Sequence, residues 1–79
     1  MSNKPAPMRE IPIRGDTIRL GQLLKLADLV DSGASARALL AGGAVAVNGE
    51  REIRRGRQLH PGDVVAAEGV ELRVVAGSD

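Results

Sequence analysis

Residues 32–63 read SGASARALLAGGAVAVNGEREIRRGRQLHPGD, and this stretch decides the fold. Ser32 is a good helix N-cap, because its hydroxyl can accept a hydrogen bond from an amide of the first turn. Gly43 suits the left-handed conformation in which many helices end. The alternating valines of residues 44–47 and the Asn48-Gly49 pair are typical of a strand that enters a tight hairpin. The sequence therefore predicts a helix, a strand and a hairpin turn in succession.

A cluster of arginines follows the hairpin signal. Four arginines stand within seven residues against the single Glu52, which leaves a local excess of three positive charges; they are Arg51, Arg54, Arg55 and Arg57. Ile53 and Leu59 are the only apolar anchors here, so we expect the arginines to lie largely on the surface. The segment ends in a second turn signal at residues 60–63. A local basic cluster in a chain whose formal net charge is only +1 indicates a polyanion-binding surface.

The segment before Ser32 predicts a strand and a first helix. Residues 1–8 contain two prolines and no periodicity, and we expect a disordered tail. Residues 9–13 predict an edge strand, where Pro12 is tolerated, and residues 14–18 a turn. Apolar residues in residues 19–30 recur at helical spacing, with Leu26 and Leu29 widening the buried face.

After the arginines, residues 64–65 and 72–75 predict two more strands joined by a turn at Glu68-Gly69. Residues 77–79 are expected to be frayed. The predicted fold is α+β, with two short helices packed on a small, mostly antiparallel sheet of about four to five strands. A single domain would span residues 9–76.

Composition excludes several classes of function. A chain of 79 residues has a small core and little capacity for an elaborate catalytic site. Without cysteine, and with a single histidine, it offers no disulfide framework and no metal site. The absence of aromatic residues excludes base stacking on Phe, Tyr or Trp. We therefore expect no catalytic residue, no metal and no cofactor.

No signal peptide and no apolar run of membrane-spanning length is found in the sequence. We expect a soluble, cytoplasmic, monomeric protein that does not bind membranes.

Residues 18–65 resemble the S-four RNA-binding domain, also called the alpha-L RNA-binding motif. That family has a leucine-rich helix, a serine-capped second helix, a Val-x-Val-Asn-Gly turn and a later Pro-Gly-Asp. The residues in register here are Leu20, Leu23, Leu24, Ser32, Ala36, Arg37, Leu39, Gly43, Val45, Val47, Asn48, Gly49, Pro61, Gly62 and Asp63. The strings LGQLLKLA, SGASAR and VNGE with RRGR resemble its small stand-alone bacterial subgroup, the YbcJ-like proteins.

The resemblance implies an RNA-binding surface formed by the second helix and the loop after the Val-Asn-Gly turn. The helix N-terminus favours a phosphate, and arginine can grip one with two parallel hydrogen bonds. The predicted RNA-binding residues are Arg54, Arg55, Arg57, Arg51, Arg37, Lys25, Arg19, Ser35 and Asn48. Many relatives carry a basic residue where this chain has Gly33, Ala41 and Ala46, so most of the binding is expected from the later loop.

Three hypotheses follow. The first is a non-catalytic module that binds structured RNA, either ribosomal RNA or tRNA, on or off the ribosome. The second is a ubiquitin-like carrier or protein-interaction domain, because VAVNGE followed by PGDVV is also similar to small sulfur carriers. The third is a domain that delivers RNA to a separate RNA-modifying enzyme.

Overall fold

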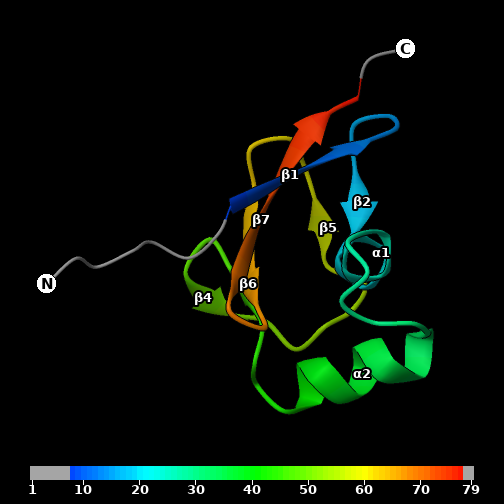
Figure 1. Ribbon diagram of the computed structural model, residues 1–79, viewed down its shortest axis with the longest axis vertical. Helices are drawn as coiled ribbons and strands as arrows, with labels where there is room; N and C mark the ends of the chain where they lie inside the picture. Colours follow the sequence, from blue (N-terminus) through cyan, green and yellow to red (C-terminus); the bar gives the residue numbers. More distant parts are fainter. Residues whose placement is uncertain (1–7, 78–79) are drawn as a thin grey trace, which may run out of the picture.

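The computed structural model describes residues 8–77, which contain seven strands and two helices (Figure 1). The elements in chain order are β1 Met8–Ile13, β2 Ile18–Arg19, α1 Leu20–Leu26, α2 Gly33–Ala41, β3 Ala46–Val47, β4 Glu50–Arg51, β5 Gln58–Leu59, β6 Val64–Ala67 and β7 Val70–Ala76. Five strands form one sheet in the order β1-β7-β6-β3-β4, and β2 pairs with β5 in a separate antiparallel ladder. In the larger sheet β1 runs parallel to β7, and the other neighbours are antiparallel. The predicted α+β fold class is confirmed.

The two predicted hairpin turns are confirmed. Asn48 and Gly49 have φ values of 51° and 86° and join β3 to β4, whose ends pair Val47 with Glu50. Glu68 and Gly69 have φ values of 53° and 77° and join β6 to β7. Two successive residues with positive φ form the turn whose twist matches antiparallel strands. The arginine-rich segment therefore leaves the sheet from a fixed point after β4.

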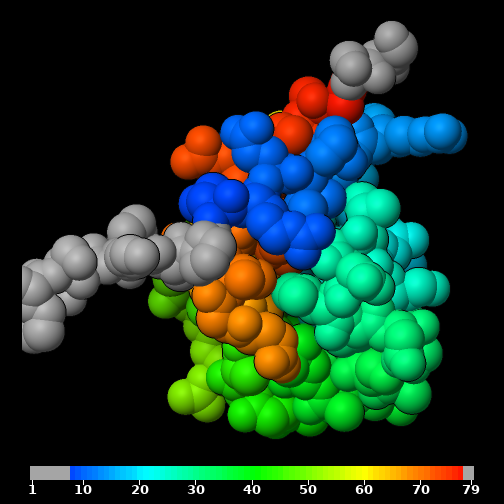
Figure 2. Space-filling model, viewed as in Figure 1, coloured from blue at the N-terminus to red at the C-terminus, as the bar shows by residue number. Residues whose placement is uncertain are grey.

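The core consists of aliphatic side chains from both helices and the sheet. Both helices lie on one side of the sheet (Figure 1), and the space-filling view shows β1 crossing one end of the molecule while the helical region fills the other (Figure 2). The buried hydrophobic residues are Ile11, Ile13, Leu20, Leu23, Leu24, Ala27, Val30, Ala36, Leu40, Val45, Val47, Leu59, Val65, Ala67, Leu72 and Val74. The predicted placement of Val45 and Val47 on one buried face is confirmed.

The first helix is shorter than predicted. The apolar spacing predicted a helix over residues 19–30, but α1 ends at Leu26. Asp28 adopts a φ of 64°, and two hydrogen bonds close the end, from Asp28 N to the carbonyl of Lys25 (3.0 Å) and from Leu29 N to the carbonyl of Leu24 (3.0 Å). This pair of bonds is a Schellman motif, which is usually built with glycine but accepts a short polar residue such as aspartate.

A second difference concerns Leu26, which was expected to widen the buried face of the helix. Its exposed fraction is 56%. Because α1 ends at this residue, the chain turns away and does not cover that side chain, while Leu29 packs partly against the core from the turn.

The edge-strand prediction is confirmed by β1, which lies at one end of the sheet order and carries Pro12. The predicted tail falls on residues outside the described range except for Met8, which begins β1. Of the predicted frayed end, only Gly77 is described, and its amide donates to the carbonyl of Ile13 at 2.9 Å.

The contrast between Leu23 and Leu26 gives a test of the corrected helix. Leu23→Ala removes a fully buried side chain and is expected to cost about 2–5 kcal/mol of unfolding free energy, which lowers the melting temperature by at least about 10 °C. Leu26→Ala should cost less than about 1 kcal/mol. Thermal unfolding followed by circular dichroism measures both, and equal losses would contradict the observed end of α1.

Candidate nucleic-acid interface

The four predicted arginines lie on or beside the segment between β4 and β5. We call residues 52–57 the arginine loop. Its backbone is tied to the start of α1, because Gly21 N donates to the carbonyl of Arg55 (2.9 Å) and Leu20 N donates to the carbonyl of Arg57 (2.8 Å). These amides belong to the first turn of the helix, where they have no partner within the helix. The loop therefore completes α1 and is itself held in place.

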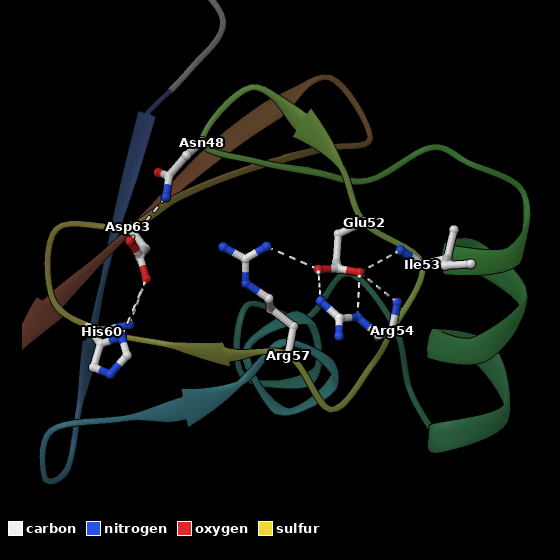
Figure 3. Close-up of polar contacts among 7 residues, drawn as sticks. All are labelled: Asn48, Glu52, Ile53, Arg54, Arg57, His60 and Asp63. Atoms are coloured by element: carbon white, nitrogen blue, oxygen red, sulfur yellow. Dashed lines mark hydrogen bonds and ion pairs between the residues drawn. The ribbon is translucent and has the colours of Figure 1, made fainter.

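The side chain of Glu52 accepts hydrogen bonds from several groups of the arginine loop (Figure 3). Its Oε2 accepts hydrogen bonds from the amides of Ile53 (3.0 Å) and Arg54 (3.1 Å) and from Arg54 Nε (3.2 Å). Its Oε1 accepts from Arg54 Nη2 (3.3 Å) and from Arg57 Nη1 (3.0 Å). The Arg54 side chain, the Arg54 amide and Arg57 together lower the pKa of Glu52 to about 2. The carboxylate is therefore charged throughout the neutral range and orients two of the arginines.

The prediction that Ile53 and Leu59 anchor this segment to the core is correct only for Leu59. Ile53 was predicted to hold the loop to the core, but its exposed fraction is 62% and its side chain points away from Glu52 (Figure 3). Glu52 is the buried residue instead, with 6% exposure, and Leu59 is fully buried as predicted. A carboxylate can replace an apolar anchor here because five hydrogen bonds satisfy its oxygens.

Arg55 lies against the two helices. A Cβ atom added at Gly21 would lie 3.3 Å from Arg55 Cβ, and one added at Gly33 would lie 3.4 Å from Arg55 Nη1. The two glycines thus leave room for this arginine at the starts of α1 and α2. Gly33 is a position where the sequence lacks an expected basic residue, and the guanidinium group of Arg55 supplies a positive charge beside it.

A groove of about 310 Å³ lies between α1, the start of α2 and the arginine loop. Its lining residues are Arg19, Gly21, Gln22, Lys25, Gly33, Ala36, Arg55 and Gly56. Three of them are cations and none is acidic. Within residues 8–77, the side chains of Arg19, Lys25 and Arg55 make no ion pair with a carboxylate. We call this groove, with its three cations, the basic groove.

The remaining predicted arginines lie elsewhere. Arg51 packs beside Gly43, where an added Cβ would lie 3.5 Å from its side chain, and it lines a separate hollow with Glu68 and Glu71. Arg37 is exposed on α2, one turn after Gly33. The structure therefore brings Arg19, Lys25 and Arg55 together, places Arg54 and Arg57 around Glu52, and separates Arg51 from the basic groove.

Ser35 and Asn48 make local structural contacts. The Ser32 hydroxyl accepts from Ser35 N at 3.1 Å, as the N-cap prediction requires, and Ser35 Oγ donates to Asp31 (2.6 Å). This last bond is the main cause of the lowered pKa of Asp31. Asn48 connects the end of β3 to the turn predicted at residues 60–63. Its side chain donates a hydrogen bond to Asp63 (3.1 Å) and accepts one from Val64 N (2.9 Å). Neither residue lines the basic groove.

Sequence reasoning missed two features of the candidate site and left a third, the role of Glu52, open between two alternatives. The glycines Gly21 and Gly33 give no sign in the sequence that a loop far along the chain packs on them. The β2–β5 ladder is only two residues long on each side, too short for a periodic pattern. The role of Glu52 had one signal, an acidic residue flanked by arginines, but that pattern does not tell an orienting ion pair from an exposed charge.

Residues 8–77 contain neither a metal-binding cluster nor a membrane-spanning helix. These residues contain no group of three or more His, Asp or Glu side chains that could hold a metal ion. None of their helices is long and apolar enough to pass through a lipid bilayer.

The comparisons with known proteins agree with the motifs in the sequence. Residues 11–75 match the family model described as the S4 domain. A probable ribosome maturation protein, RlbA of Bacillus subtilis (strain 168), is 53% identical over 60 residues, which cover 73% of this chain and 84% of that protein.

Proposed function

Because this chain belongs to the S4 domain family, the S-four family that its motifs resemble, we propose that it is a non-catalytic RNA-binding module. Its ligand is structured RNA, held through phosphate contacts from the basic groove and the arginine loop. Arg19, Lys25 and Arg55 are the main contacts in this proposal. Arg37, Arg54 and Arg57 extend the contact to either side.

The observation that carries the proposal is the composition of the basic groove. Three cations line it, no carboxylate does, and none of the three is ion-paired within the described residues. A cation without a protein partner is free to replace the counterions of a phosphate backbone. Two backbone hydrogen bonds fix the Arg55 carbonyl and the Arg57 carbonyl on α1, so little backbone entropy of this loop is lost when RNA binds.

The chemistry of the groove favours recognition of shape over sequence. Guanidinium groups make paired hydrogen bonds to phosphate oxygens, and lysine adds a compact charge. The groove offers one side-chain amide, that of Gln22, and no aromatic surface on which a base could stack. Phosphates, 2′-hydroxyls and overall shape are the features of an RNA helix that such a surface can recognise.

The identity with a probable ribosome maturation protein supports ribosomal RNA as the ligand. We therefore propose a role in the maturation of ribosomes in the bacterial cytoplasm, in which the module binds ribosomal RNA and leaves any chemistry to a separate enzyme. Binding to tRNA is the alternative that the same groove would permit.

Salt dependence tests the proposal. Three groove cations that each neutralise one phosphate contribute about −2 to −3 to the slope of log affinity against log salt, and any contact from Arg37, Arg54 or Arg57 makes the slope steeper. The measurement is fluorescence anisotropy with labelled fragments that tile the bacterial ribosomal RNAs, between 50 and 300 mM salt, with tRNA and single-stranded poly(U) as comparison ligands. Tightest binding is expected for a ribosomal fragment, and no binding to any of these RNAs at 50 mM salt would refute the function.

A further inference from the structure

Gly56 occupies an unusual place in the arginine loop, because it lines two hollows at once. One is the basic groove. The other is lined by Arg54, Gly56, Arg57, Gln58 and His60. We call the second one the outer hollow. Gly56 is the only residue common to the two linings, so it lies at the boundary between them, which we call the ridge.

Neither the backbone nor the packing explains a glycine here. The φ of Gly56 lies outside the left-handed region, and a Cβ atom built on it would meet no atom within 4 Å. This differs from Gly49, whose φ of 86° requires a residue without a side chain, and from Gly21, which lies against Arg55. An ordinary L residue would therefore fit at position 56 without strain and would project into solvent from the ridge.

The ridge is rigid. The residues on both sides of Gly56 have their carbonyls bonded to the first amides of α1, and Arg57 N donates to the carbonyl of Arg54 (3.3 Å), which closes a turn around Gly56. The loop cannot move aside to make room for a ligand without breaking these bonds. Whatever crosses from one hollow to the other must pass directly over the glycine.

The outer hollow retains donors for a phosphate. Arg54 and Arg57 direct three side-chain hydrogen bonds to Glu52, whereas each guanidinium group carries five N–H donors. Arg54 is 74% exposed at its side chain. No acidic residue lines this hollow, just as none lines the basic groove. Two cationic hollows therefore flank one ridge that carries no side chain.

From these observations we propose that Gly56 is the crossing point of an RNA strand. One phosphate binds in the basic groove near Arg55, another binds in the outer hollow near Arg54 and Arg57, and the backbone between them passes over Gly56. The absence of a side chain lets the strand approach until both phosphates are within hydrogen-bond distance of about 3 Å. This inference rests on the proposed function and adds the path of the ligand to it.

The test is a set of substitutions that add bulk at the ridge without changing charge. Gly56→Leu is expected to weaken binding of the tightest ribosomal RNA fragment by at least about 10-fold, and Gly56→Ala by less, with the melting temperature unchanged. Ala76→Leu is the matched control, because Ala76 is exposed at the end of β7, far from the loop (Figure 1). It should bind as the wild type does.

Each outcome decides the inference. Wild-type affinity in Gly56→Leu would overturn the crossing point, while the proposed function would stand if Arg55→Ala still lost affinity. A melting temperature lowered by more than a few degrees in Gly56→Leu would also overturn it, because the space above Gly56 would then not be open. If the wild-type protein bound none of the RNA fragments, the function itself would fail.

Discussion

Replacing Lys25 and Arg55 together with alanine is expected to weaken binding of structured RNA by on the order of 100-fold or more. Each charge-assisted contact is worth about 1.5–3 kcal/mol, and both side chains line the basic groove without an ion-pair partner among the described residues. The slope of log affinity against log salt should fall in magnitude by roughly 1.5–2, because two phosphate contacts are lost. Anisotropy titrations at several salt concentrations measure both quantities.

The control removes the same charge from a different surface. Arg14 and Arg73 are exposed, lie outside the basic groove and the outer hollow, and take no part in an ion pair within residues 8–77. The double variant Arg14→Ala/Arg73→Ala should lose only a few-fold in affinity through the weaker long-range field. Equal losses in the two double variants would mean that net charge alone controls binding, and the groove would have no special role. Both variants should melt within a few degrees of the wild type.

The structure changes which arginines should be replaced to test RNA binding. From the sequence, the obvious variant replaces Arg54, Arg55 and Arg57 together, on the assumption that all three are free surface cations. Arg54 and Arg57 instead share the buried carboxylate of Glu52. Removing them would leave that charge with fewer partners, and the triple variant would lose stability as well as any RNA contact. The Lys25→Ala/Arg55→Ala variant avoids this problem, because neither side chain is ion-paired with Glu52.

Local signals in the sequence predicted much of the fold. Ser32, Gly43 and the Asn48-Gly49 pair each act through their own backbone or that of a near neighbour, so their roles follow from the residue type. The end of α1 was missed because Asp28 adopts a left-handed conformation that aspartate adopts only occasionally. The apolar spacing continues past that point to Val30, and periodicity alone cannot reveal where a helix stops.

The site was predictable as a set of residue types but not as an arrangement. Four arginines in seven residues marked the loop that the structure holds against α1 and the start of α2. In the structure these four arginines separate: Arg55 lines the basic groove, Arg54 and Arg57 bind Glu52, and Arg51 lies apart. This arrangement depends on contacts with α1, α2 and the sheet, which are distant in sequence. Ile53 is exposed and Glu52 is buried, which is the reverse of the usual preference of these residue types. The burial of Glu52 is explained by the nearby amide and guanidinium groups that donate hydrogen bonds to its carboxylate.

Glu52→Gln is expected to weaken RNA binding by about 10-fold, although it removes a negative charge from the binding loop. If Glu52 merely reduced the positive field, its loss would strengthen binding. The structure favours the opposite sign, because the carboxylate accepts five hydrogen bonds and holds the side chains of Arg54 and Arg57. A glutamine would direct an NH₂ group at some of these donors. Two flexible arginines would then have to be ordered when RNA binds, at a cost in affinity.

Glu50→Gln is the matched control for this substitution. Glu50 lies in β4, two residues away, is exposed and forms no ion pair within the described residues. Its variant loses the same charge from the same segment without disturbing the loop, so its affinity should stay equal or rise slightly and its melting temperature should not change. A gain of affinity in both variants would refute the positioning role of Glu52 and leave it as a charge that opposes binding.

Stability at acid pH gives a second test of Glu52. The pKa of Glu52 falls from an ordinary value of 4.5 to about 2 in the folded state, mainly through hydrogen bonds from the Arg54 side chain. The unfolded chain therefore takes up this proton first, so the stabilisation by Glu52 is fully present above about pH 4.5 and is lost as the pH falls toward 2. Glu52→Gln should have a lower melting temperature than the wild type at pH 7 but should approach it near pH 2. Parallel curves for Glu52→Gln and the wild type between pH 7 and pH 2 would show that the arginines stabilise the loop without this carboxylate, and the loop geometry would then have to come from its two backbone bonds to α1 alone.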